Sequence, residues 1–221
     1  MTQTRPQFRL EPIVDLVSDE TLGFELLAGA DRCPDWTDDD WRAWYARMAD
    51  LFRTHIPASV RVFVNVDAHQ ALDPAIIEGL LAIPGRDRLV VEWTERISPA
   101  IHVTRTWASA RAFESLTKAG IGLAIDDVGS GYDGIGRALQ GRPAFAKLDA
   151  SLIHLARHVD PRFLRDLHAL FEGIGAVVIA EGIESPGDLE RIRAAGIRYG
   201  QGYYFTRGMG RTAMTDALDV S

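Results

Sequence analysis

Short apolar runs rich in β-branched residues alternate along the chain with longer amphipathic stretches. The short runs have the length and composition of strands, and the longer stretches have the spacing of helices. Strands are predicted at 8–17, 22–29, 60–66, 88–95, 121–127, 144–149, 176–182 and 197–205. Helices are predicted at 38–54, 69–81, 99–118, 150–157, 162–173 and 186–195. Strands that alternate with helices indicate βα units and a parallel sheet, and therefore an α/β fold.

The first two predicted strands differ from the others because only the residues SDET separate them. A connection this short cannot cross over a sheet, so these two strands are expected to pair as an antiparallel hairpin. About eight strands in one domain favour a TIM-like (β/α) barrel with an antiparallel first strand. A doubly wound open sheet has the same periodicity and remains the alternative. We expect a single domain over 1–221, with its core at about 8–210.

A polar residue follows the apolar run of almost every predicted strand. These residues are Glu25, Asn65, Glu95, Asp126, Asp127, Lys147, Glu181 and Gln201. In a barrel, the carboxyl ends of the parallel strands meet at one face, and active sites form there. The sequence therefore predicts that five carboxylates, two amides and one lysine gather in one mouth.

Each of these residues has a simpler explanation when it is taken alone. Asp and Asn begin turns and cap helices, and a lysine can end a strand in solvent. The repetition at successive strands favours a site instead, since Glu and Lys are poor turn formers. Carboxylate and amide oxygens without histidine or cysteine favour Mg²⁺ or Mn²⁺ over zinc. Crowded carboxylates repel one another unless cations neutralise them, and two metal ions per site would do so.

The overall composition limits the classes of partner. A net charge of −7 argues against non-specific binding to nucleic acid. No apolar run is long enough to cross a membrane, and the first residues lack the apolar stretch of a signal peptide. The single cysteine, Cys33, cannot form an internal disulfide, which agrees with a reducing compartment. We therefore expect a cytoplasmic protein that binds neither membrane nor nucleic acid.

The polar residues lie in motifs that follow one another in a recognisable order. The motifs are EPIVDL, GFELL with Glu25 and Leu27, FVNV with Asn65, VEWTE with Glu95, AIDDVGSGYDGI with Asp126 and Asp127, FAKLDASLI with Lys147 and Asp149, VIAEGIES with Glu181 and Glu184, and YGQGYYF with Gln201. Each motif is weak alone, but the ordered set is specific. The chain resembles the EAL family of bacterial cyclic di-GMP phosphodiesterases over roughly residues 8–210.

This resemblance implies an enzyme that hydrolyses cyclic di-GMP to linear pGpG with two Mg²⁺ or Mn²⁺ ions. It implies a first metal-ligand group of Glu25, Asn65, Glu95 and Asp126, and a second of Asp127 and Glu181. It also implies that Lys147 orients the attacking water, so the catalytic residues would be Glu25, Asp127, Lys147 and Glu181. The implied substrate-binding residues are Leu27, Asp149 and Gln201, and Glu184 would support the loop at 126–136.

Several positions depart from the family pattern, three of them near the substrate site that the resemblance implies. Gly29 stands where an arginine that contacts phosphate is usual, Glu11 where glutamine is common, and Val128 where phenylalanine is usual. Losing one charged hydrogen bond costs on the order of 1.5–3 kcal/mol of affinity, so a weakened hold on substrate is expected. One alternative is a non-catalytic EAL protein that binds cyclic di-GMP or a protein partner. Another is an unrelated metal-dependent barrel enzyme. The resemblance also implies a homodimer with an interface around 150–172.

Overall fold

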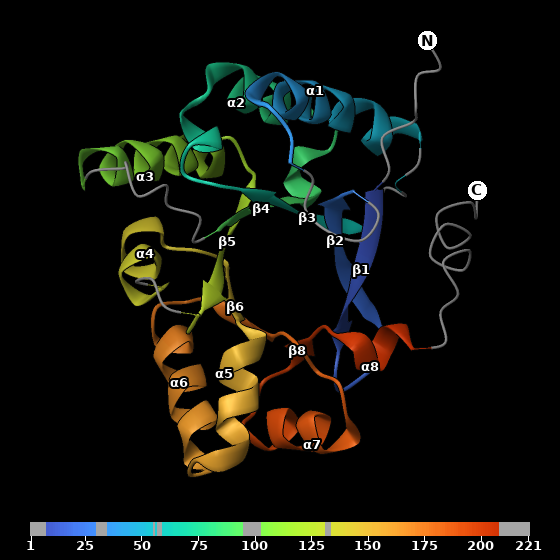
Figure 1. The fold of residues 1–221 in the computed structure, drawn as a ribbon, viewed down its shortest axis with the longest axis vertical. Helices are drawn as coiled ribbons and strands as arrows, with labels where there is room; N and C mark the ends of the chain where they lie inside the picture. Colours follow the sequence, from blue (N-terminus) through green and yellow to red (C-terminus); the bar gives the residue numbers. More distant parts are fainter. Residues whose placement is uncertain are drawn as a thin grey trace.

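The strands of this chain close into a barrel. The computed structural model of the protein describes residues 8–29, 35–54, 56, 59–94, 103–130 and 134–207. Within these residues the barrel has eight strands (Figure 1): β1 Phe8–Asp15, β2 Thr21–Ala28, β3 Arg61–Val66, β4 Leu89–Trp93, β5 Gly122–Val128, β6 Phe145–Leu148, β7 Val177–Ala180 and β8 Tyr199–Gly200. Each strand pairs with the next, and β8 returns to β1. The predicted TIM-like barrel is confirmed, and the open sheet is excluded.

β1 is the strand that runs against the others. It pairs antiparallel with both β2 and β8, whereas the remaining neighbours are parallel. The predicted hairpin is therefore confirmed. The carboxylate of Asp15 holds its turn, because Oδ1 accepts a hydrogen bond of 2.9 Å from the backbone N–H of Val17. As a result, the N-terminal end of β1 lies at the same mouth as the C-terminal ends of the parallel strands.

Helices lie outside the barrel around most of its circumference (Figure 1). Those in the described residues are α1 Asp38–Thr54, α2 Pro74–Leu81, α3 Val103–Lys118, α4 Gly134–Gly141, α5 Ala150–Leu155, α6 Arg162–Gly173, α7 Pro186–Ala194 and α8 Tyr203–Thr206. The bounds of α1 and α6 agree with the predicted helices at 38–54 and 162–173. The start of the helix predicted at 99–118 lies outside the described residues.

Two elements differ from the sequence prediction. α4 was not predicted, because its residues GIGRALQG hold three glycines, which disfavour helix. The last predicted strand, 197–205, is strand only at Tyr199–Gly200, and its aromatic end forms α8 instead. The chain turns at Gly202, where a Cβ would lie 2.4 Å from the backbone nitrogen of Ile183. In both places tertiary contact overrides local preference.

Apolar side chains pack in two shells. The outer shell lies between the barrel and the helices and includes Leu26, Val64, Trp93, Phe113 and Ile192. The inner shell fills the barrel, and we call it the apolar layer: Ile13, Phe63, Val90, Ala124, Phe145 and Ile179. Within it the rings of Phe63 and Phe145 meet edge to face, with centroids 5.2 Å apart. The apolar layer gives the mouth of the barrel an apolar floor.

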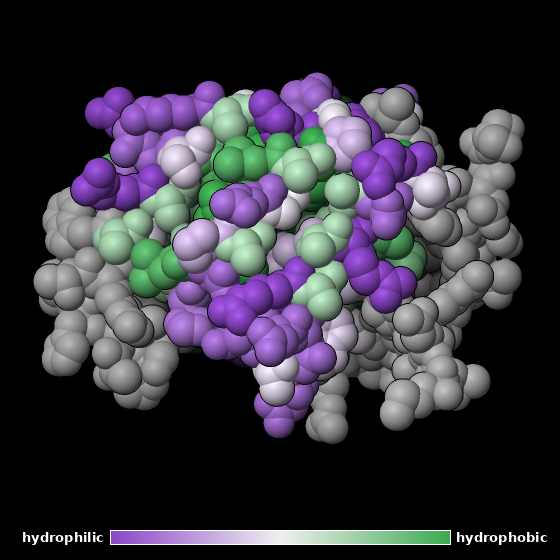
Figure 2. Space-filling view, turned by 90° about the horizontal axis from the view of Figure 1, so that it is seen from above, coloured by the Kyte–Doolittle hydropathy of each residue, from purple (hydrophilic) through white to green (hydrophobic). Residues whose placement is uncertain are grey.

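The helices are amphipathic and present a mixed outer surface. α1 and α2 form the upper side in Figure 1, and this side seen from above mixes hydrophilic and hydrophobic residues (Figure 2). Their apolar side chains point inward, where Tyr45 and Met48 of α1 and Leu80 of α2 are fully buried. Among the described helices, none has both the length and the apolar character needed to cross a lipid bilayer.

Candidate metal centre

A layer of polar side chains lies inside the barrel just beyond the apolar layer. Side chains alternate between the two faces of a strand, so the residue two positions after an inward-facing residue also faces inward. From the apolar layer this step leads to Asn65, Glu92, Asp126, Lys147 and Glu181, and β2 adds Glu25. We call these six residues the polar layer. All of them are buried or half-buried.

Lys147 stands at the centre of the polar layer. Its Nζ lies 3.1 Å from Glu25 Oε2, 2.9 Å from Glu92 Oε1, 3.2 Å from Asp126 Oδ1 and 2.8 Å from Glu181 Oε1. Burial lowers the pKa of Lys147, but the four carboxylates, Asp126 foremost, outweigh burial and raise this pKa well above its ordinary value. One fixed positive charge thus faces four acidic groups.

Glu25 is the best-satisfied carboxylate of the polar layer. Asn65 Nδ2 donates to its Oε1 at 2.7 Å, and Gln201 Nε2 donates to its Oε2 at 2.8 Å. Lys147 Nζ also donates to Oε2, at 3.1 Å. Burial raises the pKa of Glu25, but Lys147 and the two amides outweigh burial and hold this pKa below its ordinary value. Glu25 therefore carries its negative charge in the folded protein.

The other three carboxylates of the layer are in a different electrostatic state. Burial, followed by repulsion from neighbouring carboxylates such as Glu25, raises the pKa of Glu92 well above its ordinary value. Burial is also the largest cause of the raised pKa values of Asp126 and Glu181. Both oxygens of Glu92 and Oδ1 of Asp126 accept no well-formed hydrogen bond from the described residues, although Lys147 lies within ion-pair distance. Four carboxylates share the single positive charge of Lys147, so these buried oxygens are only partly neutralised.

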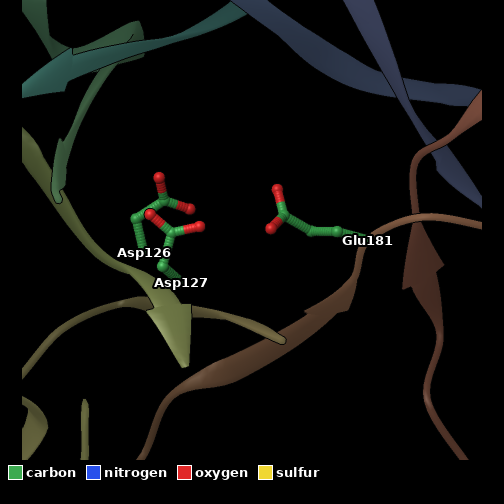
Figure 3. Close-up of side chains that lie close together, drawn as sticks. All are labelled: Asp126, Asp127 and Glu181. Carbon is green, nitrogen blue, oxygen red and sulfur yellow. The ribbon is translucent and has the colours of Figure 1, made fainter. Parts of the chain in front are cut away.

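Two adjacent aspartates at the end of β5 both face the mouth. Neighbouring side chains of a regular strand point to opposite faces. Here the pairing of β5 with β6 shifts register between Ile125 and Val128, and Asp127 has a φ of 55°. This bulge turns Asp127 towards the same side as Asp126. Carboxylate oxygens of Asp126, Asp127 and Glu181 lie within 4.8 Å of one another, and Figure 3 shows the three groups converging.

The donor set fits a hard divalent cation. It consists of carboxylate oxygens and the amide of Asn65, which are ligands that Mg²⁺ and Mn²⁺ prefer. A bound cation would also add to the single charge of Lys147 beside the oxygens of Glu92 and Asp126 that accept no hydrogen bond from the described residues. Glu25, Asn65, Glu92, Asp126, Asp127 and Glu181 could therefore hold a metal ion.

Most residues predicted for the site come together in the structure. Glu25, Asn65, Asp126, Asp127, Lys147, Glu181 and Gln201 all lie at the mouth of the barrel. Glu95 lies outside the described residues. Glu92 is the acidic residue that sequence reasoning missed: it is 0% exposed and sits beside Lys147. The alternation of β4 could have found it, because Glu92 is two positions from inward-facing Val90.

Three further predicted residues lie around this mouth or behind it. Leu27 is half-buried on β2, one inward step beyond Glu25. Asp149 caps α5, since its Oδ1 accepts a hydrogen bond of 2.8 Å from the backbone N–H of Ser151. Glu184 Oε2 lies 3.8 Å from His154 Nε2 on α5. Their roles towards substrate and loop remain predictions.

Arg137 was also missed, and it supports the ends of two strands that carry residues of the polar layer. This side chain of α4 is 4% exposed. Its Nη1 donates to the carbonyl oxygen of Trp93 at 2.5 Å, and its Nη2 donates to that of Asp126 at 2.9 Å. It thereby ties the C-terminal ends of β4 and β5 together behind Glu92 and Asp126. No local sequence signal marks it, because α4 itself was not predicted.

The model of one protein family, the EAL domain, matches residues 41–208. The chain belongs to the EAL domain family. Its relatives include cyclic di-GMP phosphodiesterases, among them PdeL of Escherichia coli, which is 31% identical over 160 residues that make up 68% of this chain and 42% of PdeL. The chain spans half the length or less of the curated relatives it matches, from 50% down to 15%.

Solved EAL structures share the barrel. The EAL domain of Mycobacterium smegmatis DcpA superposes with a TM-score of 0.77 at 21% sequence identity, covering 99% of this chain and 98% of that chain. The Klebsiella pneumoniae protein BlrP1, solved as a complex with manganese and cyclic di-GMP, superposes with a TM-score of 0.73 at 22% identity, covering 92% of this chain and 56% of BlrP1. These likenesses establish the fold of the EAL domain described here.

Proposed function

We propose that this EAL domain hydrolyses cyclic di-GMP to linear pGpG and requires Mg²⁺ or Mn²⁺. The observation that carries the proposal is the polar layer, in which four carboxylates share the single positive charge of Lys147. Membership of a family that includes cyclic di-GMP phosphodiesterases supports the choice of substrate. The manganese and cyclic di-GMP bound by BlrP1, which has the same fold, are consistent with it.

The polar layer and the adjacent Asp127 offer two groups of ligands. The first group is Glu25, Asn65, Glu92 and Asp126, and the second is Asp127 and Glu181. Glu92 takes the place that the sequence motif assigned to Glu95, because it faces inward and contacts Lys147. Divalent ions held there would lower the pKa of a water molecule to near neutrality and offset the charge of the phosphodiester.

Side chains of the polar layer then orient the attacking water and the phosphodiester. The ammonium of Lys147 keeps its proton and can donate a hydrogen bond to the attacking water or to a phosphate oxygen. The water oxygen bonds to phosphorus, its proton passes to Asp127 or Glu181, and the bond from phosphorus to the ribose 3′ oxygen breaks. That oxygen takes a proton from solvent, which gives linear pGpG. Gln201 and Asn65 hold Glu25 in place throughout, while Leu27 and Asp149 are proposed to contact the nucleotide.

The first experiment measures product directly. Purified protein is incubated with cyclic di-GMP and Mg²⁺ or Mn²⁺, and pGpG is followed by chromatography. Glu25→Ala is the test variant, and Glu190→Ala, an exposed position on α7, is the matched control. We expect metal-dependent product from the wild type and the control and none from Glu25→Ala. Chelation with EDTA should stop the reaction, and added Mn²⁺ should restore it.

Two other outcomes would replace the proposal. Binding of cyclic di-GMP without product would indicate a receptor, the alternative favoured by the loss of an arginine at Gly29. The backbone there has a φ of 84°, a conformation that suits glycine better than arginine. Neither binding nor product would indicate a protein-binding adaptor.

The homodimer expected around 150–172 stays a prediction. Exposed apolar side chains of that segment, Leu155, Val159, Phe163 and Leu170, are the contacts that it would use. Sedimentation equilibrium of the wild type and Leu155→Glu would test it, and a monomeric wild type would contradict it.

A further inference from the structure

Arg9 and Glu11 lie on β1 beside the polar layer. Glu11 pairs with Glu25 across the hairpin, and Arg9 pairs with Leu27. Both face inward, because Ile13 on the same strand belongs to the apolar layer and side chains alternate. Arg9 is thus one inward step beyond Glu11 and Glu25, which is about 6–7 Å further out along the strand. This position is the rim of the mouth.

The guanidinium of Arg9 is oriented but not fully paired. Its Nε donates to Glu11 Oε1 at 3.0 Å. Its Nη1 is buried and has no hydrogen-bond partner among the described residues. A buried donor without an acceptor costs free energy, so the guanidinium has donor capacity that its contacts with the described residues do not use. The pair is also accessible, since the side chains of Arg9 and Glu11 are 31% and 34% exposed.

The distribution of charge around the mouth places Arg9 and Lys147 in different environments. Both are cations on inward positions at the mouth end of the described strands. Lys147 is fully buried among four carboxylates and is already surrounded by negative charge. The end of β2 adds no charge at the rim, because it consists of Ala28 and then Gly29. An anion that enters the mouth therefore meets Arg9 before it meets the acidic polar layer.

We propose that Arg9 is a substrate-binding residue, whose guanidinium donates a hydrogen bond to a phosphate oxygen of the cyclic dinucleotide. Glu11 is a positioning residue that fixes the guanidinium through Nε. The inference rests on the proposed function, because a phosphodiester anion is the ligand of that function. It also explains how an acidic mouth whose β2 end lacks a cation can hold a substrate with two negative charges.

The test compares the wild type, Arg9→Gln and Arg9→Lys, with Arg165→Gln on the exposed face of α6 as the control for loss of one positive charge. For each protein, KM and kcat for pGpG formation, the equilibrium affinity for cyclic di-GMP, the affinity for Mn²⁺ and the melting temperature are measured. Arg9→Gln should weaken binding of cyclic di-GMP about 10- to 100-fold, as expected for a charge-assisted hydrogen bond. Its kcat and its affinity for Mn²⁺ should stay within about twofold of the wild type.

Arg9→Lys should fall between the wild type and Arg9→Gln, because lysine keeps the charge but loses the planar fork. Added KCl should weaken binding more in the wild type than in Arg9→Gln. Unchanged affinity in Arg9→Gln, with an active wild type, would overturn the role of Arg9 and leave the proposed function standing. Parallel losses of Mn²⁺ affinity or melting temperature would overturn it in favour of a structural role. A wild type that neither binds nor cleaves cyclic di-GMP would overturn both proposals.

Discussion

Two layers of side chains fill the barrel of this EAL domain, and they differ in chemistry although the same strands carry them. The apolar layer, from Ile13 to Ile179, is at most 7% exposed, and its two phenylalanine rings meet edge to face. The polar layer lies one inward step further along the parallel strands and gathers four carboxylates around Lys147. The same strands position both layers, so the difference between the layers comes from the chemistry of their side chains.

The two layers act in opposite directions on stability. Burying an aliphatic or aromatic side chain stabilises the fold by about 1.5–3 kcal/mol. Burying carboxylates costs free energy unless cations match them, and the raised pKa values of Glu92, Asp126 and Glu181 are the sign of that cost. The apolar layer thus stabilises the barrel, whereas the polar layer lowers stability and favours the binding of a cation.

Removing the positive charge of Lys147 should have the largest effect on stability and on activity. In Lys147→Met, four buried carboxylates lose their shared partner, so the free energy of unfolding without metal should fall by about 3–5 kcal/mol. Urea denaturation measures this change, and pGpG formation should be lost. Added Mn²⁺ should recover part of the stability, because the ion binds only the folded site. A variant as stable as the wild type without metal would show that the carboxylates are already neutral.

Removing one acidic group should affect chemistry more than stability. Glu92→Gln should reduce pGpG formation by more than about 100-fold, beyond the range typical of residues that only support a metal ligand. Glu95→Gln is the paired comparison and should reduce it much less, since Glu92 is the residue beside Lys147. Steady-state kinetics in Mn²⁺ and Mn²⁺ titrations measure both variants. The opposite ranking would return the ligand role to Glu95.

The buried carboxylate of Asp188, outside the polar layer, should stabilise the fold in its charged form. Asp188 of α7 accepts from Arg157 Nε at 2.9 Å and Nη2 at 2.8 Å and completes a capping box with Ser185. Burial raises the pKa of Asp188, but Arg157 and Ser185 outweigh burial and lower this pKa to about 2. Asp188→Asn should therefore cost about 2 kcal/mol of stability at neutral pH.

The pH dependence of this contribution follows from the lowered pKa. The stabilisation by Asp188 is complete above the ordinary value of 3.8 and is lost as the pH falls through about 2. Urea denaturation of the wild type and Asp188→Asn, at neutral pH and near pH 2, measures the difference. The two curves should converge at the acidic end. A constant gap across this range would mean that packing, not charge, holds Asp188.

A change within the apolar layer should have the smallest effect. Ile179 is 0% exposed, and Ile179→Val removes one methylene, so the free energy of unfolding should fall by about 0.5–1.5 kcal/mol. The kcat for pGpG should not change, because Glu181, two residues later, keeps its place. Thermal melting and steady-state kinetics measure the two quantities. A large loss of kcat would show that the apolar layer also sets the geometry of the polar layer.

The sequence by itself determined an α/β fold with an antiparallel first strand and most of the residues that gather at the mouth. Alternating strand and helix patterns favoured the barrel but left the open sheet as an alternative, and periodic stretches such as α1 and α6 have the predicted bounds. Polar residues at strand ends located Glu25, Asn65, Asp126, Lys147 and Glu181, because strand direction and alternation are local properties that barrel closure then brings together.

Tertiary structure alone decided the remaining features. α4 forms from a glycine-rich segment whose Arg137 is anchored by the carbonyl oxygens of Trp93 and Asp126. A bulge turns Asp127 to the same side as Asp126, and strand propensity cannot show this. The positions of Glu92 beside Lys147 and of Arg9 beside Glu11 depend on register across the closed barrel. Register is a relation between strands, so it becomes fixed only when the barrel closes.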